Sequence, residues 1–286
     1  MATSEIIFSR ILVATDFSGP ATLALKMAIL ISETFGAKLS IVHAATPVGY
    51  GIDTGAVPIE VLNANLDADK EQINQLVLSE PGLGQLKPSI TVAYAETVDL
   101  INQVSRKDNI DLIVVGSHGA SGLERLALGS VAEAVLHQAR CPVLIVGPQC
   151  RPERYPFRSI LFATDLRTTG LRAAQYATGL AERFHSKLTL LHVMKQRPTP
   201  SREDEPIADL KRLIPPDADC YCKADVRVEY GKVAEVIAAV SESECASLIV
   251  IGLRAHVLGD HAPWSTVAQV TREVKVAVLG VRGHYA

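Results

Sequence analysis

The stretch Ile11-Leu-Val-Ala-Thr-Asp16 recurs 149 residues later as Ile160-Leu-Phe-Ala-Thr-Asp165. The stretch Lys38-Leu-Ser-Ile-Val-His43 recurs at the same offset as Lys187-Leu-Thr-Leu-Leu-His192. A constant offset across two separate apolar segments indicates that one ancestral unit occurs twice in the chain. Each half is therefore expected to fold as a copy of the same domain.

A later segment shows the same duplication with a shorter spacing. Asp111-Leu-Ile-Val-Val-Gly116 matches Ser247-Leu-Ile-Val-Ile-Gly252 at an offset of 136, so the second copy is 13 residues shorter between its second and third strands. The stretch 147–156 between the copies is rich in proline and charge, which is typical of a linker. These observations predict one domain over residues 1–148 and a second over residues 156–286.

Each half alternates short runs rich in Val, Ile and Leu with longer amphipathic segments. This pattern is typical of βαβ units around a buried parallel sheet, so we predict an α/β fold with five strands in each half. The strands are expected near residues 8–15, 38–44, 89–94, 110–116 and 142–147, and near 158–164, 187–193, 225–230, 247–252 and 275–281. The helices are expected near residues 20–35, 58–79, 97–107 and 130–139, and near 169–184, 205–213, 231–243 and 265–273.

Composition and charge exclude several classes of protein. Hydrophobic residues make up 48% of the 286 residues and charged residues 21%, which excludes global disorder. The net charge of −3 argues against nucleic acid or an anionic membrane surface as the main partner. No apolar run reaches the roughly 18–20 residues of a membrane span. The first residues lack the pattern of a secretory signal, so we expect a cytoplasmic protein without a membrane span.

The cysteines favour reduced thiols. Cys141, Cys150, Cys220, Cys222 and Cys245 are an odd set without C-x-x-C spacing, which does not suit a disulfide framework. A zinc site at the C-x-C stretch 220–222, together with two later histidines, is a weaker alternative because that spacing is not typical of zinc ligands.

A cluster of glycines follows the predicted strand at 110–116. The chain reads Gly116-Ser-His-Gly119, then nine residues, then Gly129-Ser130 at the start of a predicted helix. Glycine permits a tight turn and a close approach of the backbone to a ligand because it has no Cβ. A helix start offers free N–H groups and the positive end of the helix dipole to an anion. The stretch predicts a triphosphate cradle, with simple turns and an ordinary helix cap at Ser130 as the alternative.

The stretch Ala14-Thr15-Asp16 ends the first predicted strand. In a doubly wound sheet the ends of the first and fourth strands lie side by side at the switch point where ligands bind. Asp16 is therefore expected to accept a hydrogen bond from a ribose hydroxyl or a base edge, and the backbone of Val42 to flank an adenine. The alternative for Asp16 is to cap the helix that follows.

These motifs resemble the universal stress protein family in its tandem two-domain form. The resemblance covers essentially the whole chain, and G-x-x-G-x9-G-(S/T) beside A-x-D after the first strand is specific for the ATP-binding branch. It implies a Rossmann-like domain in each half, with a five-stranded parallel sheet flanked by helices, and it implies ATP with Mg²⁺ as cofactors. Carried over by position, the cofactor-binding residues are Ala14, Thr15, Asp16, Val42, Val115, Gly116, His118, Gly119, Gly129, Ser130 and Val131.

The second copy departs from this motif. It reads Gly252-Leu-Arg-Ala255, then nine residues, then Ser265, so alanine replaces the second glycine and serine the third. A Cβ at a position of close approach obstructs the backbone or a phosphate. Asp165 is retained at the end of the first strand of this copy. The sequence therefore predicts a degenerate nucleotide site in the second half.

The motifs of several enzyme classes are missing. The chain has no G-x-x-x-x-G-K-[ST], G-x-S-x-G or H-E-x-x-H stretch, so we assign no catalytic residue and no metal-ligating residue, and expect at most slow ATP hydrolysis. The leading hypothesis is a cytoplasmic ATP-binding universal stress protein with a regulatory or sensory role in the stress response. The alternative is a nucleotide-independent interaction scaffold whose pockets are vestigial or hold another ligand. An adenylyl-transferring enzyme is a weaker third option, because the expected pyrophosphate loop does not follow the first strand.

The expected partners are an adenine nucleotide and the other half of the same chain. We predict that the two halves pair through their last strands, near residues 141–146 and 275–281, because an unpaired apolar edge strand invites aggregation and duplicated domains commonly replace a symmetric dimer. Further association as a homodimer is left open.

Overall fold

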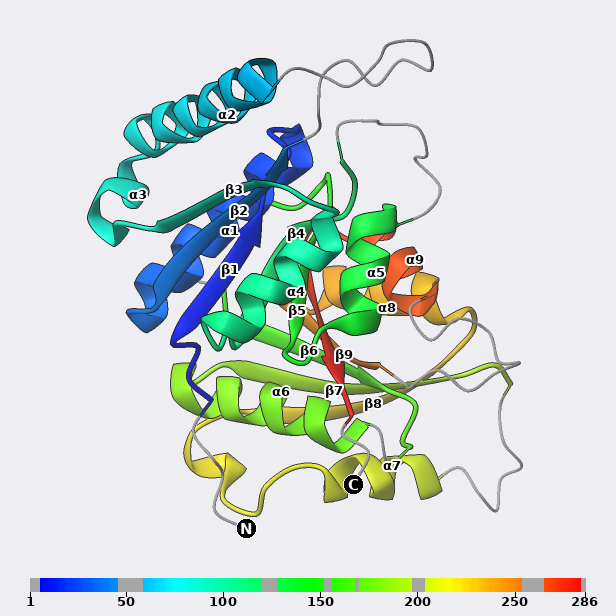
Figure 1. The fold of residues 1–286 in the computed structure, drawn as a ribbon. Helices are drawn as coiled ribbons and strands as arrows, with labels where there is room; N and C mark the ends of the chain where they lie inside the picture. Colours follow the sequence, from blue (N-terminus) through cyan, green and yellow to red (C-terminus); the bar gives the residue numbers. More distant parts are fainter. Residues whose placement is uncertain are drawn as a thin grey trace.

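A computed structural model gives the fold of the chain (Figure 1). It describes residues 6–45, 59–119, 128–151, 156–167, 170–196, 204–253 and 265–283. Over these ranges, none of the helices has the length and apolar character needed to cross a membrane.

The first half alternates strands and helices. Its strands are β1 (Arg10–Ala14), β2 (Lys38–Ala45), β3 (Ser89–Tyr94), β4 (Leu112–Gly116) and β5 (Val143–Val146). Its helices are α1 (Gly19–Phe35), α2 (Ile59–Ser79), α3 (Pro81–Leu86), α4 (Thr97–Lys107) and α5 (Ser130–Gln138). Helix α3 is not predicted from the sequence, because the proline and the two glycines of this short helix are typical of a turn.

The second half repeats the same order of elements. Its strands are β6 (Ser159–Thr164), β7 (Lys187–Met194), β8 (Ala224–Tyr230), β9 (Leu248–Leu253) and β10 (Ala277–Arg282). Its helices are α6 (Gly170–Phe184), α7 (Glu205–Arg212), α8 (Val233–Ser243) and α9 (Ser265–Glu273), with a short 3-10 helix, η2 (Ala218–Cys220). The predicted α/β fold with five strands in each half is confirmed.

The strands form one continuous sheet in the order β3-β2-β1-β4-β5-β10-β9-β6-β7-β8. Neighbouring strands within each half are parallel. Strands β5 and β10 pair antiparallel, with Val278 opposite Ile145 and Leu279 opposite Leu144. In the structure the halves thus meet at their last strands, the segments at which the sequence analysis places their contact.

Helices cover both faces of this sheet, and each face has its own hydrophobic core. In β1, Ile11 and Val13 belong to the core that includes residues of α1 and α6. Leu12, between them, belongs to the core under α4, α5, α8 and α9. This alternation follows from the two-residue period of a strand. Because each core contains residues of both halves, the two copies share their hydrophobic interior.

The loop after the first strand has the same conformation in both halves. Phe17 has a φ of 61° and Leu166 a φ of 60°. The Phe17 N–H donates to Thr15 Oγ1, and the Leu166 N–H donates to Thr164 Oγ1, each over 3.1 Å. The duplicated sequence therefore produces a duplicated turn at the carboxyl end of the sheet, where the candidate site lies.

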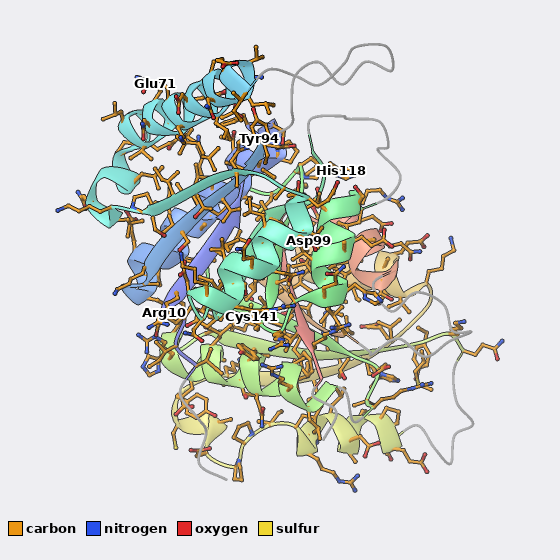
Figure 2. The ribbon with its side chains drawn as sticks, viewed as in Figure 1. Arg10, Glu71, Tyr94, Asp99, His118 and Cys141 are labelled. Carbon is orange, nitrogen blue, oxygen red and sulfur yellow. The ribbon has the colours of Figure 1, made fainter. Side chains whose placement is uncertain are left out.

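Helices α2 and α3 lie at the outer edge of the first half, beside β3 (Figure 1). Among the residues of α2 only Ile73 is buried, and α3 buries Leu83. Tyr94, at the end of β3, donates to the carbonyl of Leu62 on α2 over 2.7 Å (Figure 2). A Cβ at Gly82 would lie 2.4 Å from a side chain of α1, so this glycine lets α3 pack against α1. The two helices are thereby held against the sheet.

Candidate nucleotide site

A cavity of about 700 Å³ opens at the carboxyl ends of β1 and β4. These strands are neighbours in the sheet, and the order of strands reverses between them, which makes this the switch point of the first half. Its volume is within the range of roughly 300–1,000 Å³ typical of small-molecule sites. All of the predicted site residues except Val42 line it. The lining residues that were not predicted are Phe17, Ala21, His43, Ala44, Asn65, Ala68, Asp69, Thr97, Ser117 and Ala132.

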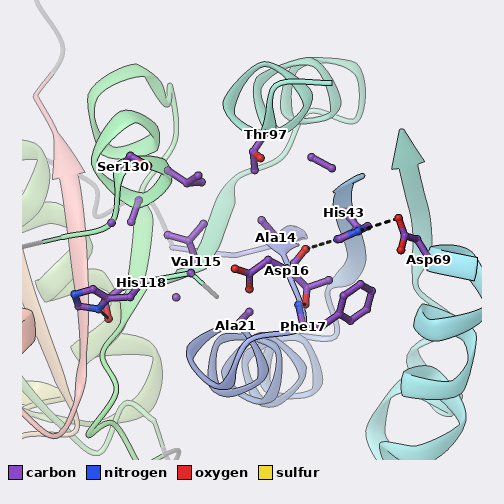
Figure 3. A pocket seen from close by; sticks show the side chains of 18 of the residues that line it. Ala14, Asp16, Phe17, Ala21, His43, Asp69, Thr97, Val115, His118 and Ser130 are labelled. Atoms are coloured by element: carbon purple, nitrogen blue, oxygen red, sulfur yellow. Dashed lines mark hydrogen bonds and ion pairs between the residues drawn. The ribbon is translucent and has the colours of Figure 1, made fainter. Parts of the chain in front are cut away.

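Asp16 lies in the middle of this cavity wall (Figure 3). Its Oδ1 accepts hydrogen bonds from the N–H and the hydroxyl of Ser18. Ser18, and not Asp16, is the N-cap of α1, since the Ser18 hydroxyl accepts from the N–H of Ala21 over 3.3 Å. The capping role considered for Asp16 is therefore filled by another residue, and the structure leaves Asp16 on the cavity wall.

The three glycines of the motif each have a close neighbour within the protein. A Cβ at Gly119 would lie 2.7 Å from Asp16 Oδ2, and one at Gly116 would lie 2.8 Å from the backbone of Pro20 at the start of α1. A Cβ at Gly129 would lie 3.1 Å from the carbonyl oxygen of Ser117. Gly116 thus lets α1 approach β4, while Gly119 brings the loop against the Asp16 carboxylate.

The first turn of α5 faces the cavity with its backbone donors. Gly129 is the N-cap and has no side chain to accept from them. Its own N–H donates to the Ser117 carbonyl over 2.8 Å. The next three residues, Ser130, Val131 and Ala132, line the cavity, and the N–H groups of a first helical turn have no acceptor within the helix. This helix start is suited to an anion.

Val42 does not reach the cavity. Its exposed fraction is 1%, and its carbonyl accepts from the N–H of Thr15 over 3.0 Å, because Val42 lies opposite Ala14 within the sheet. Strand β2 continues to Ala45, beyond the end of β1. Backbone groups of alternate residues in a strand point to the same neighbour, so the N–H and C=O of Ala44 point past the end of β1. Ala44 lines the cavity in place of Val42.

His43 is part of the cavity wall, whereas the sequence analysis does not assign it to the site. Its Nδ1 donates to the carbonyl of Thr15 over 2.8 Å, because a carbonyl oxygen can only accept. Its Nε2 lies 3.5 Å from Asp69 Oδ2 of α2. Its ring lies 4.6 Å from that of Phe17, centroid to centroid. The recurrence of a histidine at the same strand end in both copies is the signal that could have identified this position.

The residues of the cavity fit a polar ligand. Nε2 of His118 and Nδ2 of Asn65 are buried on its wall and have no hydrogen-bond partner within the described parts of the chain. An unpaired buried donor or acceptor costs about 1–3 kcal/mol, so a ligand that pairs with these atoms would gain that energy. Figure 3 shows Ser130 on one side of the cavity and Asp69 on the other, so the wall with the helix start and the wall formed by α2 are separate.

The charge of the cavity bears on which cofactors it can hold. No lysine or arginine is among the described residues that line it, so a triphosphate there needs a counter-ion. No group of three or more His, Cys, Asp or Glu in the described ranges could hold a metal ion by itself. A magnesium ion would therefore be held by the phosphates, with Asp16 as the carboxylate beside the glycine loop.

The second half retains part of the same arrangement. His192 Nδ1 donates to the carbonyl of Thr164 over 2.9 Å, as His43 does to Thr15. Ala255 and the residues that follow it up to 264 lie outside the described residues, as does the side chain of Ser265. The predicted loss of nucleotide binding in this half stays a prediction.

None of the cysteines within the described residues forms a disulfide. Cys220 is exposed and Cys222 is buried. The histidines of the zinc alternative, His256 and His261, lie outside the described residues.

Comparison with family models gives two matches along the chain. The model of the universal stress protein family matches residues 8–147 and, a second time, residues 156–282. The two matches together cover nearly all of the chain and agree with the duplication seen in its sequence.

Individual relatives match one domain at a time. Universal stress protein A homolog 1 of Coxiella burnetii is 35% identical over 148 residues, which are 49% of this chain and 96% of the relative. Universal stress protein YxiE of Bacillus subtilis is 30% identical over 147 residues, which are 49% of this chain and 99% of the relative.

The crystal structure of a universal stress protein from Archaeoglobus fulgidus is similar to both domains together. It covers 95% of this chain and 97% of its own, with a TM-score of 0.69 and 19% identity. That likeness is one of fold.

Proposed function

The chain belongs to the universal stress protein family and carries two tandem copies of its domain, and we propose that the first copy binds ATP with Mg²⁺ as a regulatory or sensory ligand. The observation that carries the proposal is the cavity at the switch point of the first half. It combines a helix start with free backbone donors, a glycine loop against Asp16, and two buried polar atoms without a protein partner.

The cavity offers separate groups to the parts of a nucleotide. The N–H and C=O of Ala44, beyond the end of β1, form a donor and acceptor pair suited to the edge of an adenine. Asp16 is suited to accept from a ribose hydroxyl. The first turn of α5, from Ser130 onward, and the glycine loop provide backbone N–H groups for phosphates. Bound Mg²⁺ would neutralise phosphate charge.

The same residues give little help to phosphoryl transfer. Efficient transfer needs a positioned nucleophile and cationic groups that stabilise the transition state. Backbone donors and a carboxylate position a nucleotide, but they do not supply those cations. We therefore expect ATP to act as a ligand signal, with turnover far below the roughly 1–10³ per second of dedicated enzymes.

One experiment tests binding and turnover on the same preparation. Full-length protein is titrated with ATP and Mg²⁺ by calorimetry, and its thermal midpoint and rate of ATP hydrolysis are measured at saturating nucleotide. We expect one site per chain and a higher midpoint, because a ligand that binds only the native state adds about 2.7 kcal/mol at a hundred times its dissociation constant.

Asp16→Ala is the matched variant for this experiment. It should weaken binding, since Asp16 lies on the cavity wall. Rapid hydrolysis that is lost in this variant would show an ATPase. A midpoint that does not respond to ATP would favour the alternative, a scaffold that works without nucleotide.

A further inference from the structure

The face of α2 that turns to the sheet carries polar residues where an amphipathic helix has apolar ones. Leu62, Leu66, Ile73 and Leu76 follow each other at helical spacing, and all are at least partly buried. Asp69 interrupts this stripe. Asn65, one turn before Asp69, lies on the same side of the helix, because residues four apart are neighbours on a helix surface.

Asp69 is partnered, and its partner fixes the position of α2. His43 lies between the Thr15 carbonyl, which accepts a hydrogen bond from Nδ1, and the Asp69 carboxylate, which lies 3.5 Å from Nε2. Figure 3 shows the contact between His43 and Asp69, which joins β2 to α2. The contact holds the cavity-facing side of α2 against the end of β2.

Asn65 has no such partner. Its Nδ2 is buried, has no hydrogen-bond partner among the described residues, and belongs to the cavity wall. A buried amide nitrogen without a hydrogen-bond partner destabilises the protein unless a group in the cavity accepts a hydrogen bond from it. The residue therefore points to a ligand group that accepts a hydrogen bond on the α2 side of the cavity.

That side is the one suited to the base. Helix α2 packs on β2 and β3, so Asn65 lies on the same side as Ala44. The first turn of α5, suited to phosphates, lies on the opposite side (Figure 3). A carboxamide presents one donor and one acceptor, which match N7 and the N6 amino group of adenine. Guanine presents two acceptors, N7 and O6, at the same edge, and so opposes the amide oxygen.

We propose that Asn65 is a specificity-determining residue that contacts the N7 edge of the adenine and discriminates against guanine, with the His43–Asp69 contact as its positioning device. This inference rests on the proposed nucleotide site and adds to it the base-recognition role of helix α2. Ala44 serves the other polar edge of the base, so the two residues share only the N6 amino group, of which each accepts a different hydrogen.

The test measures the affinities of ATP, GTP and 7-deaza-ATP for the full-length protein by calorimetry in the presence of Mg²⁺. In 7-deaza-ATP a C–H group replaces N7, so the acceptor is removed while the shape is kept. The variants are Asn65→Ala and, as matched control, Asn63→Ala, because Asn63 is an exposed asparagine on the same helix.

We expect wild type to bind ATP about tenfold more tightly than 7-deaza-ATP, the effect of one well-formed hydrogen bond. Asn65→Ala should bind ATP and 7-deaza-ATP equally. It should lose only part of its preference for ATP over GTP, because the N–H and C=O of Ala44 still oppose the N1–H and O6 of guanine. Asn63→Ala should behave as wild type.

Four outcomes overturn the proposal. Equal affinities of wild type for ATP and 7-deaza-ATP, or an Asn65→Ala variant that keeps the full difference between them, would show that Asn65 does not contact N7. If Asn65→Ala lowers the affinities for ATP and 7-deaza-ATP by the same factor, the role of Asn65 is merely structural. A wild-type protein that binds none of the three nucleotides overturns the proposed function itself, which separates that failure from the other three.

Discussion

Gly119 and Asp16 lie close together on the cavity wall, so a side chain at position 119, even one methyl group, would contact the Asp16 carboxylate. The Cβ of an alanine at position 119 would lie 2.7 Å from Asp16 Oδ2, below ordinary contact distance. The carboxylate is the end of a flexible side chain, so it can move away, but it then leaves the position from which it faces the cavity. The substitution therefore acts on the ligand site rather than on the fold.

We predict that Gly119→Ala lowers the affinity for ATP by about tenfold, because it displaces a carboxylate that would contact the ligand. The measurement is calorimetric titration, with thermal unfolding of the free protein as a check on stability. Gly84→Ala is the control, since a Cβ there has no atom within 4 Å. Unchanged ATP affinity in Gly119→Ala would contradict the placement of the ligand beside this loop.

Cys141 lies where the two halves meet (Figure 2). Burial raises the pKa of its thiol to about 11, while Cys220 and Cys245 are exposed. Because only the thiolate reacts with alkylating reagents, Cys141 should be labelled by iodoacetamide at pH 8 about a hundredfold more slowly than an ordinary thiol. Mass spectrometry of peptides after timed labelling checks this. Labelling of Cys141 as fast as Cys220 would contradict its burial in the folded protein.

Among the secondary-structure elements, the end of α8 ties two strands of the second half together. Glu244, just after this helix, forms ion pairs with Lys187 of β7 and, over 3.0 Å, with Arg227 of β8. The hydrogen bond from Lys187 lowers the pKa of Glu244 below its ordinary value of 4.5, with a smaller contribution from Arg227, against the opposing effect of burial. The side chains of Lys187 and Arg227 are partly exposed while that of Glu244 is only 10% exposed, so solvent and salt screen the contact in part.

We predict that Glu244→Gln lowers the free energy of unfolding by about 0.5–1 kcal/mol at pH 7, the usual contribution of a partly exposed ion pair. A carboxyl group with a lowered pKa in the folded state stabilises the protein above its ordinary pKa and loses this effect as the pH falls through the lowered value. The difference between wild type and variant should therefore disappear in urea titrations at progressively lower pH, starting below about pH 4.5. A difference that grows on acidification would contradict the ion pair.

Helix α2 illustrates how an element can serve the site more than the core. It has 21 residues, of which one is buried, and it is held by Tyr94, by the His43–Asp69 contact and by α3. Few buried apolar contacts mean low local stability, which is common in elements that respond to ligands. We therefore expect ATP to slow the amide hydrogen exchange of α2 more than that of any other element.

In the whole molecule, the two halves form one sheet with two shared cores. Antiparallel pairing of β5 with β10 places Leu279 opposite Leu144, and both are almost fully buried. Phe8 and Phe35 of the first half pack with Tyr176, Phe157 and Phe184 of the second. A disturbance at the junction should therefore reach both copies.

We predict that the protein unfolds in a single transition and that Leu279→Ala lowers its stability by about 2–5 kcal/mol in both halves together, the usual cost of such a cavity. Hydrogen exchange in β7 reports on the second half, and hydrogen exchange in β2 reports on the first. Leu78→Ala is the control, because Leu78 is 78% exposed. Destabilisation confined to the second half would show that the copies fold independently.

The sequence by itself determined the duplication, the order of the strands and of the helices apart from α3, and the segments that carry the glycine loop and Asp16. These features depend on hydrophobic periodicity and on local backbone demands, which neighbouring residues in the chain express directly. The repeated Thr15 and Thr164 turns belong to the same group, because their hydrogen bonds span only two residues.

Only the tertiary structure decided which residues of β2 and α2 face the cavity. The offset between β1 and β2 places Val42 inside the sheet and Ala44 beyond its end, and no local pattern encodes how far one strand extends past its neighbour. Asn65 and Asp69 line the cavity because α2 packs on α3, β3 and β2. Such placements result from packing between segments far apart in sequence, so they are fixed only when the whole domain has folded.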